Sequence, residues 1–306
     1  MLEPSLSLLS RLWLSEPDAE LLRAAIEAGF PPTSIDDLAL AYTDLFLLNV
    51  YPYGSVYLDS SGELNGAPAA RAERLYALAA YSPPDLLRAA GADHAGLCIG
   101  FLAHAAEKGV DDSEMRRMLR AWIPVCTLAV EREPGAHEFY RFLARATREQ
   151  LLSEPPPPET QEDFLGEFGL SPGADGEIRL SDVLRFLLTP ARCGFFLSRG
   201  RIGQLARSAG LRIPFGSRFE VARSVFEQSG EEAIVSGLID LLTRERDEWE
   251  QSLEELSKRH PTWAPQGRFW KARLEGTREA LAAMRGIVES PPPWEYRDKE
   301  GEATGP

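Results

Sequence analysis

Cysteine is scarce in this chain of 306 residues, which has three, at positions far apart. Cys98, Cys126 and Cys193 form no C-x-x-C pair, and an odd number of separated thiols argues against a disulfide framework or a structural zinc site. His94 and His104 are ten residues apart, and no third ligand stands near them in the sequence. We therefore expect no metal site, and the sequence implies no cofactor.

Long apolar runs are also missing. No stretch approaches the roughly 20 apolar residues that a helix needs to span a bilayer. The N-terminus carries Glu3 early and has neither a basic start nor a small-residue cleavage site, so it does not read as a secretory signal. We therefore expect a cytoplasmic protein without a membrane partner.

The sequence signatures of common enzymes are absent. There is no G-x-x-x-x-G-K-[ST] loop, no G-x-G-x-x-G in a βαβ pattern and no G-x-S-x-G elbow. Three of the four histidines lie between positions 94 and 137, with no candidate nucleophile beside them. We predict no catalytic residues and expect a binding protein, not an enzyme.

Apolar residues recur at helical spacing along most of the chain, and no clear period-2 strands are found. An all-α fold is therefore predicted, with Ser34 placed to cap one of the helices. Four consecutive prolines at 155–158 form a stiff spacer. The predicted units are a first domain at 1–153, a Pro/Gly-rich linker at 154–180, a helical C-terminal extension at 181–290 and a disordered tail at 291–306.

Charge is distributed unevenly within the net charge of −14. Residues 1–182 carry 14 basic and 29 acidic residues (−15), residues 183–224 carry eight arginines and one glutamate (+7), and the remainder carries 11 and 17 (−6). An acidic first half favours basic partners through long-range attraction and disfavours nucleic acid. An acidic face that only meets solvent is the alternative.

The basic segment supports a competing hypothesis. Residues 201–211 resemble the middle of a helix-turn-helix, so an alternative function is a nucleic-acid-binding regulator that uses the Arg-rich segment 199–223. The following segment looks packed, because it carries Phe215, Phe219, Val221 and Val225. A helix that contacts DNA bases needs polar side chains at such positions. Binding of a phosphate-bearing cofactor or of an acidic surface is a third interpretation.

A tyrosine-rich segment follows residues 41–48, which are predicted to be the end of the amphipathic helix that Ser34 caps. Pro52 ends the regular hydrogen bonding, and residues 50–57 are expected not to be helical. Tyr51, Tyr53 and Tyr57 have apolar bodies and polar tips, which suits either a wet peptide groove or the closure of a helical core. Further on, Asp93 is placed to cap the next helix, with His94 in its first turn.

These segments occur in the order Y-x-x-L-F, P-Y-x-S-V-Y, D-H, W-x-P and F-Y. In order and spacing they resemble the TorD/DmsD/NarJ family of cytoplasmic chaperones for molybdoenzymes, over about residues 1–153. The matching positions are Tyr42, Leu45, Phe46, Pro52, Tyr53, Ser55, Val56, Tyr57, Asp93, His94, Phe101, Trp122, Pro124, Phe139 and Tyr140.

The resemblance implies a TorD-like helical bundle, here with an additional C-terminal helical unit. It implies a system-specific chaperone that binds the apo catalytic subunit of a molybdenum oxidoreductase by its twin-arginine leader peptide, assists cofactor insertion and releases the subunit for export. Such a protein is a monomer or a homodimer. A groove lined by aromatic rings would hold the peptide, and His94 would make binding sensitive to pH. The implied peptide-binding residues are Tyr53, Ser55, Tyr57, Asp93, His94, Phe101 and Trp122.

Overall fold

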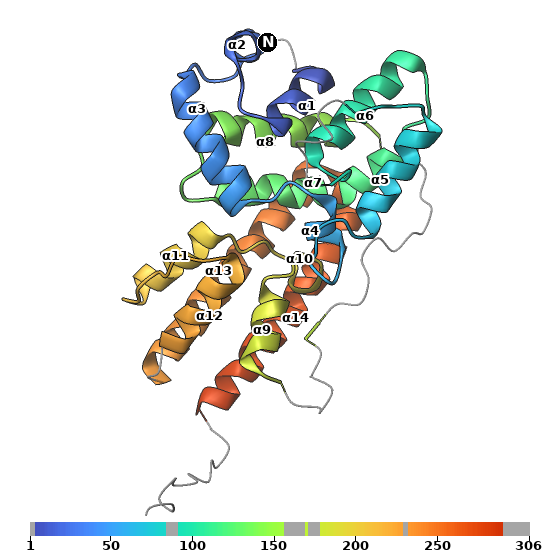
Figure 1. The fold of residues 1–306 in the computed structure, drawn as a ribbon. Coiled ribbons are helices and arrows are strands. Elements are labelled where there is room, and N and C mark those ends of the chain that lie inside the picture. Colours follow the sequence, from blue (N-terminus) through green and yellow to red (C-terminus); the bar gives the residue numbers. More distant parts are fainter. Residues whose placement is uncertain (1–3, 84–90, 156–168, 171–177, 229–231, 290–306) are drawn as a thin grey trace, which may run out of the picture.

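The computed structural model describes residues 4–83, 91–155, 169–170, 178–228 and 232–289. Every regular element within these ranges is a helix, and an isolated antiparallel bridge joins Tyr53 to His94. The structure therefore confirms the all-α fold (Figure 1).

The first half of the chain is a bundle in which α1 packs on α6 and α7 packs on α8. Several of its helices start where the sequence supplies a capping side chain, as at Ser34, whose hydroxyl accepts the Asp37 N–H. The elements are α1 (Leu6–Leu14), α2 (Ala19–Glu27), α3 (Ile35–Tyr42), the π-helix η1 (Thr43–Asn49), α4 (Gly54–Leu58), α5 (Ala67–Leu78), α6 (Ala95–Lys108), α7 (Ser113–Arg132) and α8 (Glu138–Ser153).

The second half is also helical, and its two longest helices, α13 and α14, lie side by side. A short 3₁₀ turn, η2, joins them. The elements are α9 (Leu180–Leu187), α10 (Pro190–Cys193), α11 (Arg199–Ser208), α12 (Arg218–Gln228), α13 (Glu232–Arg259), η2 (Pro261–Trp263) and α14 (Ala264–Glu289).

A proline inside α7 helps to join the two halves. Pro124 has no N–H, so the carbonyl of Arg120, four residues earlier, lacks its helical partner. The indole of Trp263 donates to this carbonyl at 2.9 Å, and the indole of Trp270 donates to the carbonyl of Ala121 at 2.9 Å. Two tryptophans of the second half thus satisfy backbone groups of the first.

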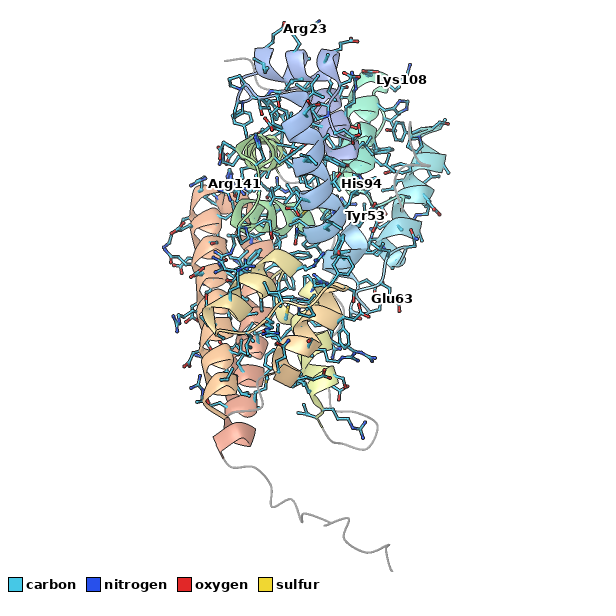
Figure 2. All side chains as sticks on the ribbon, turned by 60° about the vertical axis from the view of Figure 1, so that its left-hand side comes forward. Arg23, Tyr53, Glu63, His94, Lys108 and Arg141 are labelled. Carbon is cyan, nitrogen blue, oxygen red and sulfur yellow. The ribbon has the colours of Figure 1, made fainter. Side chains whose placement is uncertain are left out.

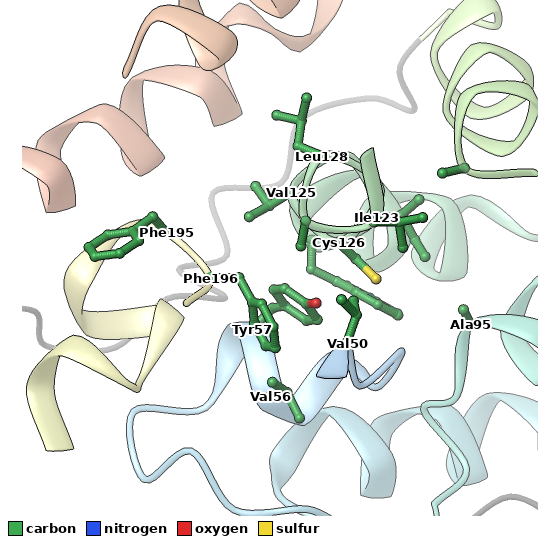
Figure 3. Close-up of a cluster of buried hydrophobic side chains, with 14 of the residues drawn as sticks. Val50, Val56, Tyr57, Ala95, Ile123, Val125, Cys126, Leu128, Phe195 and Phe196 are labelled. Atoms are coloured by element: carbon green, nitrogen blue, oxygen red, sulfur yellow. The ribbon is translucent and has the colours of Figure 1, made fainter. Parts of the chain in front are cut away.

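A shared aromatic core lies beside this contact. The ring of Tyr57 stacks between Trp122 of α7 and Phe196 of the second half, with centroid distances of 5.5 Å on each side. Figure 3 shows Tyr57 and Phe196 within a cluster that also holds Val56, Val125 and Cys126. The apolar cores of the two halves are therefore continuous.

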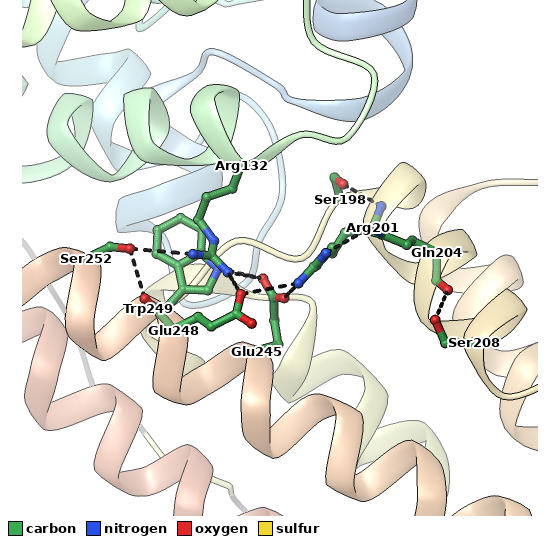
Figure 4. Close-up of polar contacts among 9 residues, drawn as sticks. All are labelled: Arg132, Ser198, Arg201, Gln204, Ser208, Glu245, Glu248, Trp249 and Ser252. Carbon is green, nitrogen blue, oxygen red and sulfur yellow. Dashed lines mark hydrogen bonds and ion pairs between the residues drawn. The ribbon is translucent and has the colours of Figure 1, made fainter.

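Ionic contacts close the same interface. Glu245 of α13 is buried and pairs with Arg132 of α7 at 3.1 Å and with Arg201 of α11 at 2.5 Å (Figure 4). At the end of η1, the side-chain oxygen of Asn49 accepts the N–H of Gly200 at 2.7 Å. A buried carboxylate between two guanidinium groups is favourable only while both partners stay in place, which fixes the relative position of α7, α11 and α13.

The predicted division into domains stays a prediction. Most of the linker at 154–180 and all of the tail at 291–306 lie outside the described residues. The described parts of both predicted domains share the core and the ionic contacts above.

One local prediction was wrong. Residues 54–57, expected to be non-helical, belong to the short helix α4. Pro52 does keep the preceding residues extended, but the carboxylate of Asp93 accepts the N–H of Ser55 in the first turn of α4. This contact comes from a distant part of the chain and stabilises a helix too short to form alone.

Candidate functional site

The two motif segments at 51–57 and 92–95 meet through their backbones. The N–H of Gly54 donates to the carbonyl of Asp93 at 3.0 Å, and the N–H of Ala95 donates to the carbonyl of Pro52 at 2.8 Å. These bonds flank the bridge between Tyr53 and His94. The pairing places both side chains next to each other, as Figure 2 shows.

Asp93 lies beneath this pairing and is fully buried. One carboxylate oxygen accepts both the N–H and the hydroxyl of Ser55, each at 2.5 Å, and the Ser55 hydroxyl also accepts the N–H of Gly66 at 3.1 Å. Burial raises the pKa of Asp93, and the hydrogen bonds from Ser55 oppose that rise. Asp93 thus fixes the tyrosine-rich loop from below and does not face solvent.

His94, and not Asp93 as predicted, caps helix α6. Nδ1 of His94 accepts the N–H of Gly96 at 3.1 Å, so His94 is the N-cap of α6. The prediction that Asp93 caps this helix was wrong, because its side chain turns to the start of α4 instead. In this arrangement Nδ1 is an acceptor and the ring is neutral.

Burial also overturns the expected pH response of His94. Its ring packs edge-on against Tyr53, with centroids 4.9 Å apart, and its removal from water lowers the pKa of His94 to about 3. His94 therefore stays neutral across the physiological range and cannot switch binding near pH 6.5. The cause is desolvation, which disfavours the charged ring.

A cleft of about 290 Å³ opens beside this pair of rings. Its volume lies near the lower end of the range found for ligand-binding pockets. Leu47 on η1 is 59% exposed at its edge, and the exposed Glu16 adds a carboxylate. The lining residues are Leu14, Ser15, Glu16, Tyr42, Phe46, Leu47, Pro52, Tyr53 and His94.

Part of the cleft wall is the π-helix η1, which continues α3 without a break. A π-helical turn is energetically costly and is often found at functional sites. Here it carries Phe46 into the core and leaves Leu47 and Leu48 exposed. The irregular backbone thus presents an apolar edge to solvent beside the cleft.

Three of the residues predicted to bind peptide lie elsewhere. Tyr57, Phe101 and Trp122 are 0%, 1% and 0% exposed, respectively. Phe196 covers Tyr57, whose other face stacks on Trp122, and Phe101 packs against Tyr76 and Tyr81. In this conformation these three rings are core, so the predicted groove lined by them is not open.

Of the predicted set, only Tyr53 and His94 line the cleft, while Ser55 and Asp93 hold the loop behind it. The sequence did not indicate Leu14, Ser15, Glu16 or Leu47 as lining residues. Tyr42, Phe46 and Pro52 were recognised as motif positions but not as a surface. No signal in the sequence shows that the end of α1 reaches the tyrosine-rich loop.

For the part of the chain that the structure describes, the geometry indicates neither a metal site nor a membrane-spanning helix. Among the described residues, no group of three or more His, Cys, Asp or Glu side chains could hold a metal ion. Within the same ranges, no helix combines the length and apolar character that crossing a bilayer requires.

Two arginines of the basic segment make contacts within the protein that stabilise the fold. Arg201 pairs with Glu245, and Arg218 donates to the carbonyls of Leu188 and Leu197 at 2.7 and 3.4 Å. Neither side chain is presented for a nucleic acid, so these contacts do not favour the helix-turn-helix alternative.

The described residues form an all-helical fold with a cleft beside the paired motif segments. Residues 14–130 match the family described as nitrate reductase delta subunit, which confirms the resemblance to NarJ/TorD-type chaperones for this part of the chain. That family consists of chaperones for molybdoenzyme maturation and acts with nitrate reductase-type subunits. The match contains every residue that lines the cleft. No curated protein and no solved structure matches the chain.

Proposed function

We propose that this protein is a system-specific chaperone that binds an apo molybdoenzyme subunit by its twin-arginine leader peptide. It holds the subunit in the cytoplasm while the cofactor is inserted and releases it before export. The observation that supports this function is the open cleft, lined by both apolar and polar groups, at the point where the two family motif segments pair.

The chemistry of such a leader suits the cleft. A leader of this type carries two arginines followed by an apolar stretch. The apolar part of the lining can take up a side chain from that stretch, and Glu16 at the rim can pair with an arginine. The net charge of −15 on residues 1–182 attracts the basic end from a distance. Release requires moderate affinity, and micromolar binding corresponds to about −8 kcal/mol.

Within this proposal the predicted site residues take two roles. Tyr53 and His94 contact the peptide from the cleft wall. Ser55 and Asp93 position the loop that carries Tyr53, while Tyr57, Phe101 and Trp122 support it from the core. The oligomeric state, monomer or homodimer, remains a prediction.

The proposed function is tested by calorimetric titration with the twin-arginine leader of a molybdoenzyme subunit encoded in the same genome. We expect saturable micromolar binding that weakens with added salt. Leu47→Ser should weaken binding about tenfold, the scale of losing one buried apolar side-chain contact. Glu16→Gln should reduce the salt dependence.

Leu40→Ser is the matched control, because Leu40 is an exposed leucine of α3 that does not line the cleft. Its affinity should equal that of the unchanged protein. Absence of binding to any such leader would refute the proposed function, and equal losses in the Leu40 and Leu47 variants would refute the assignment of the site.

A further inference from the structure

A second surface lies on the loop between α11 and α12, residues 209–217. This loop is anchored at several points. The side chain of Gln228 donates to the carbonyl of Arg212 at 3.2 Å, and the N–H of Ser217 donates to the carboxylate of Glu220 at 2.8 Å. Ile213 packs so closely on Gly203 that a Cβ there would lie 3.0 Å from it. The loop therefore has a defined conformation.

Phe215 points away from the protein although its loop neighbours point inward. Leu211 and Ile213 pack against the core, whereas Phe215 is 96% exposed. Burying a phenylalanine side chain is favourable, and the conformation of this loop leaves the ring without that stabilisation. An aromatic ring that a fixed loop presents to solvent is typical of the residues that anchor protein–protein interfaces.

The surroundings of Phe215 are basic. The guanidinium carbon of Arg199 lies 5.4 Å from the centroid of the Phe215 ring. Arg207 and Arg212, near the end of α11, are exposed. None of the ion pairs between described residues involves these three arginines, in contrast to Arg201. The local charge of residues 183–224 is +7 in a chain of net charge −14.

We propose that Phe215 together with Arg199, Arg207 and Arg212, called here the Phe215 surface, is a docking site for an acidic protein segment that carries an apolar side chain. Phe215 would contact the apolar side chain, and the three arginines would pair with carboxylates around it. Aromatic residues and arginine are the types most enriched in protein interfaces.

Charge distribution favours a short acidic segment over an extended anionic partner. Residues outside 183–224 sum to −15 and −6, a total of −21. This charge repels a membrane surface or a long nucleic acid, which must approach more than one small patch. At physiological salt, screening over about 8 Å lets a short segment interact with the Phe215 surface alone. The elements that carry it are distinct from those that line the cleft, so it does not depend on the leader-binding proposal.

The test measures fluorescence anisotropy of a short labelled peptide in which glutamates flank one leucine and one phenylalanine. We expect saturable binding at low salt that weakens as salt is added. Phe215→Ser should weaken binding at least about tenfold. A joint Arg207→Gln and Arg212→Gln variant should bind more weakly and with a smaller salt dependence.

Leu78→Ser is the matched control, since Leu78 is a strongly exposed leucine on α5, remote in sequence from this loop. It should bind the peptide like the unchanged protein. The proposal is overturned if the peptide does not bind saturably, or if the Phe215 variant binds it normally. It is also overturned if phosphatidylglycerol vesicles or a DNA duplex displace the peptide and themselves bind in a Phe215-dependent manner.

Discussion

Asp93 and His94 are neighbours in the sequence, yet the fold gives them separate tasks. The carboxylate of Asp93 holds the first turn of α4, and the ring of His94 caps α6. Both side chains are buried, and burial shifts both pKa values toward the neutral form, upward for Asp93 and downward for His94. The pair is therefore uncharged more readily than either group would be in water.

The shift at His94 predicts a pH-dependent stability. The unfolded chain binds a proton at His94 near pH 6.5, and the folded protein does so only near pH 3. The contribution is therefore fully present above pH 6.5 and is lost as pH falls from 6.5 toward 3. His94→Asn keeps an N-cap but removes this titration. Between pH 7 and pH 5 the unchanged protein should lose about 2 kcal/mol more stability than the variant.

Urea unfolding at the two pH values measures this difference. Asp93 shifts stability in the opposite direction, but it is present in both proteins, so it does not enter the comparison. Equal losses in the two proteins would show that His94 titrates normally in the folded state.

The bond between Asp93 and Ser55 can be measured by a double-mutant cycle. Asp93→Ala leaves the buried N–H of Ser55 without an acceptor and should cost about 2–3 kcal/mol. Ser55→Ala should cost about 1 kcal/mol. Because the two side chains share one bond, the double variant should lose less than the sum, as seen in urea unfolding. Additive losses would contradict the contact.

At the scale of elements, α7 is the helix that connects the two halves. Pro124 of the W-x-P motif has no N–H to donate to the carbonyl of Arg120. Trp263 of η2 donates to that carbonyl, and Trp270 of α14 donates to the neighbouring carbonyl of Ala121. The motif therefore creates a docking point on a helix that would otherwise offer no free backbone acceptors at its centre. Arg132, near the end of the same helix, adds the pair with Glu245.

This arrangement predicts a specific coupling. Trp263→Phe should cost about 1–2 kcal/mol, because the carbonyl of Arg120 then lacks any donor. In a Pro124→Ala background the N–H of residue 124 can donate to the carbonyl of Arg120, so Trp263→Phe should cost less stability. Chemical denaturation of the four proteins measures the coupling.

Trp270→Phe serves as the control for this cycle. It removes a bond to the carbonyl of Ala121, whose helical donor is the N–H of Val125 and not that of residue 124. Its cost should be the same with or without Pro124. If Pro124→Ala reduced the stability cost of both tryptophan substitutions equally, the unpaired carbonyl of Arg120 would not explain the coupling.

At the scale of the whole molecule, the two halves share one core. Phe196 of the second half covers Tyr57 of the first, which in turn stacks on Trp122. Phe196→Ala would open a cavity at this contact and should cost about 3–5 kcal/mol. Because the core is continuous, hydrogen exchange should show equal loss of protection in α6 and in α13.

Phe269→Ala on α14 is the control, since this ring is half exposed. Its effect on exchange should be small in both halves. Loss of protection confined to the second half in the Phe196 variant would show that the two halves unfold separately.

The sequence by itself determined the helical class, several helix starts and the resemblance to the chaperone family. Apolar spacing reports helices because one face of each must be buried, and caps such as Ser34 act within a few residues. The order of the short motifs was enough for this resemblance because all of those positions except Phe139 and Tyr140 lie within the matched residues 14–130.

Only the tertiary structure decided which of the motif residues reach a surface. A pattern shows that Tyr57 and Trp122 are apolar but not that Phe196, from a distant segment, covers them. In the same way, Leu14 and Glu16 reach the cleft because of how α1 packs on α6, and Asp93 turns to α4 because Ser55 offers two donors there. These outcomes depend on contacts between segments far apart in the chain, which local spacing does not encode.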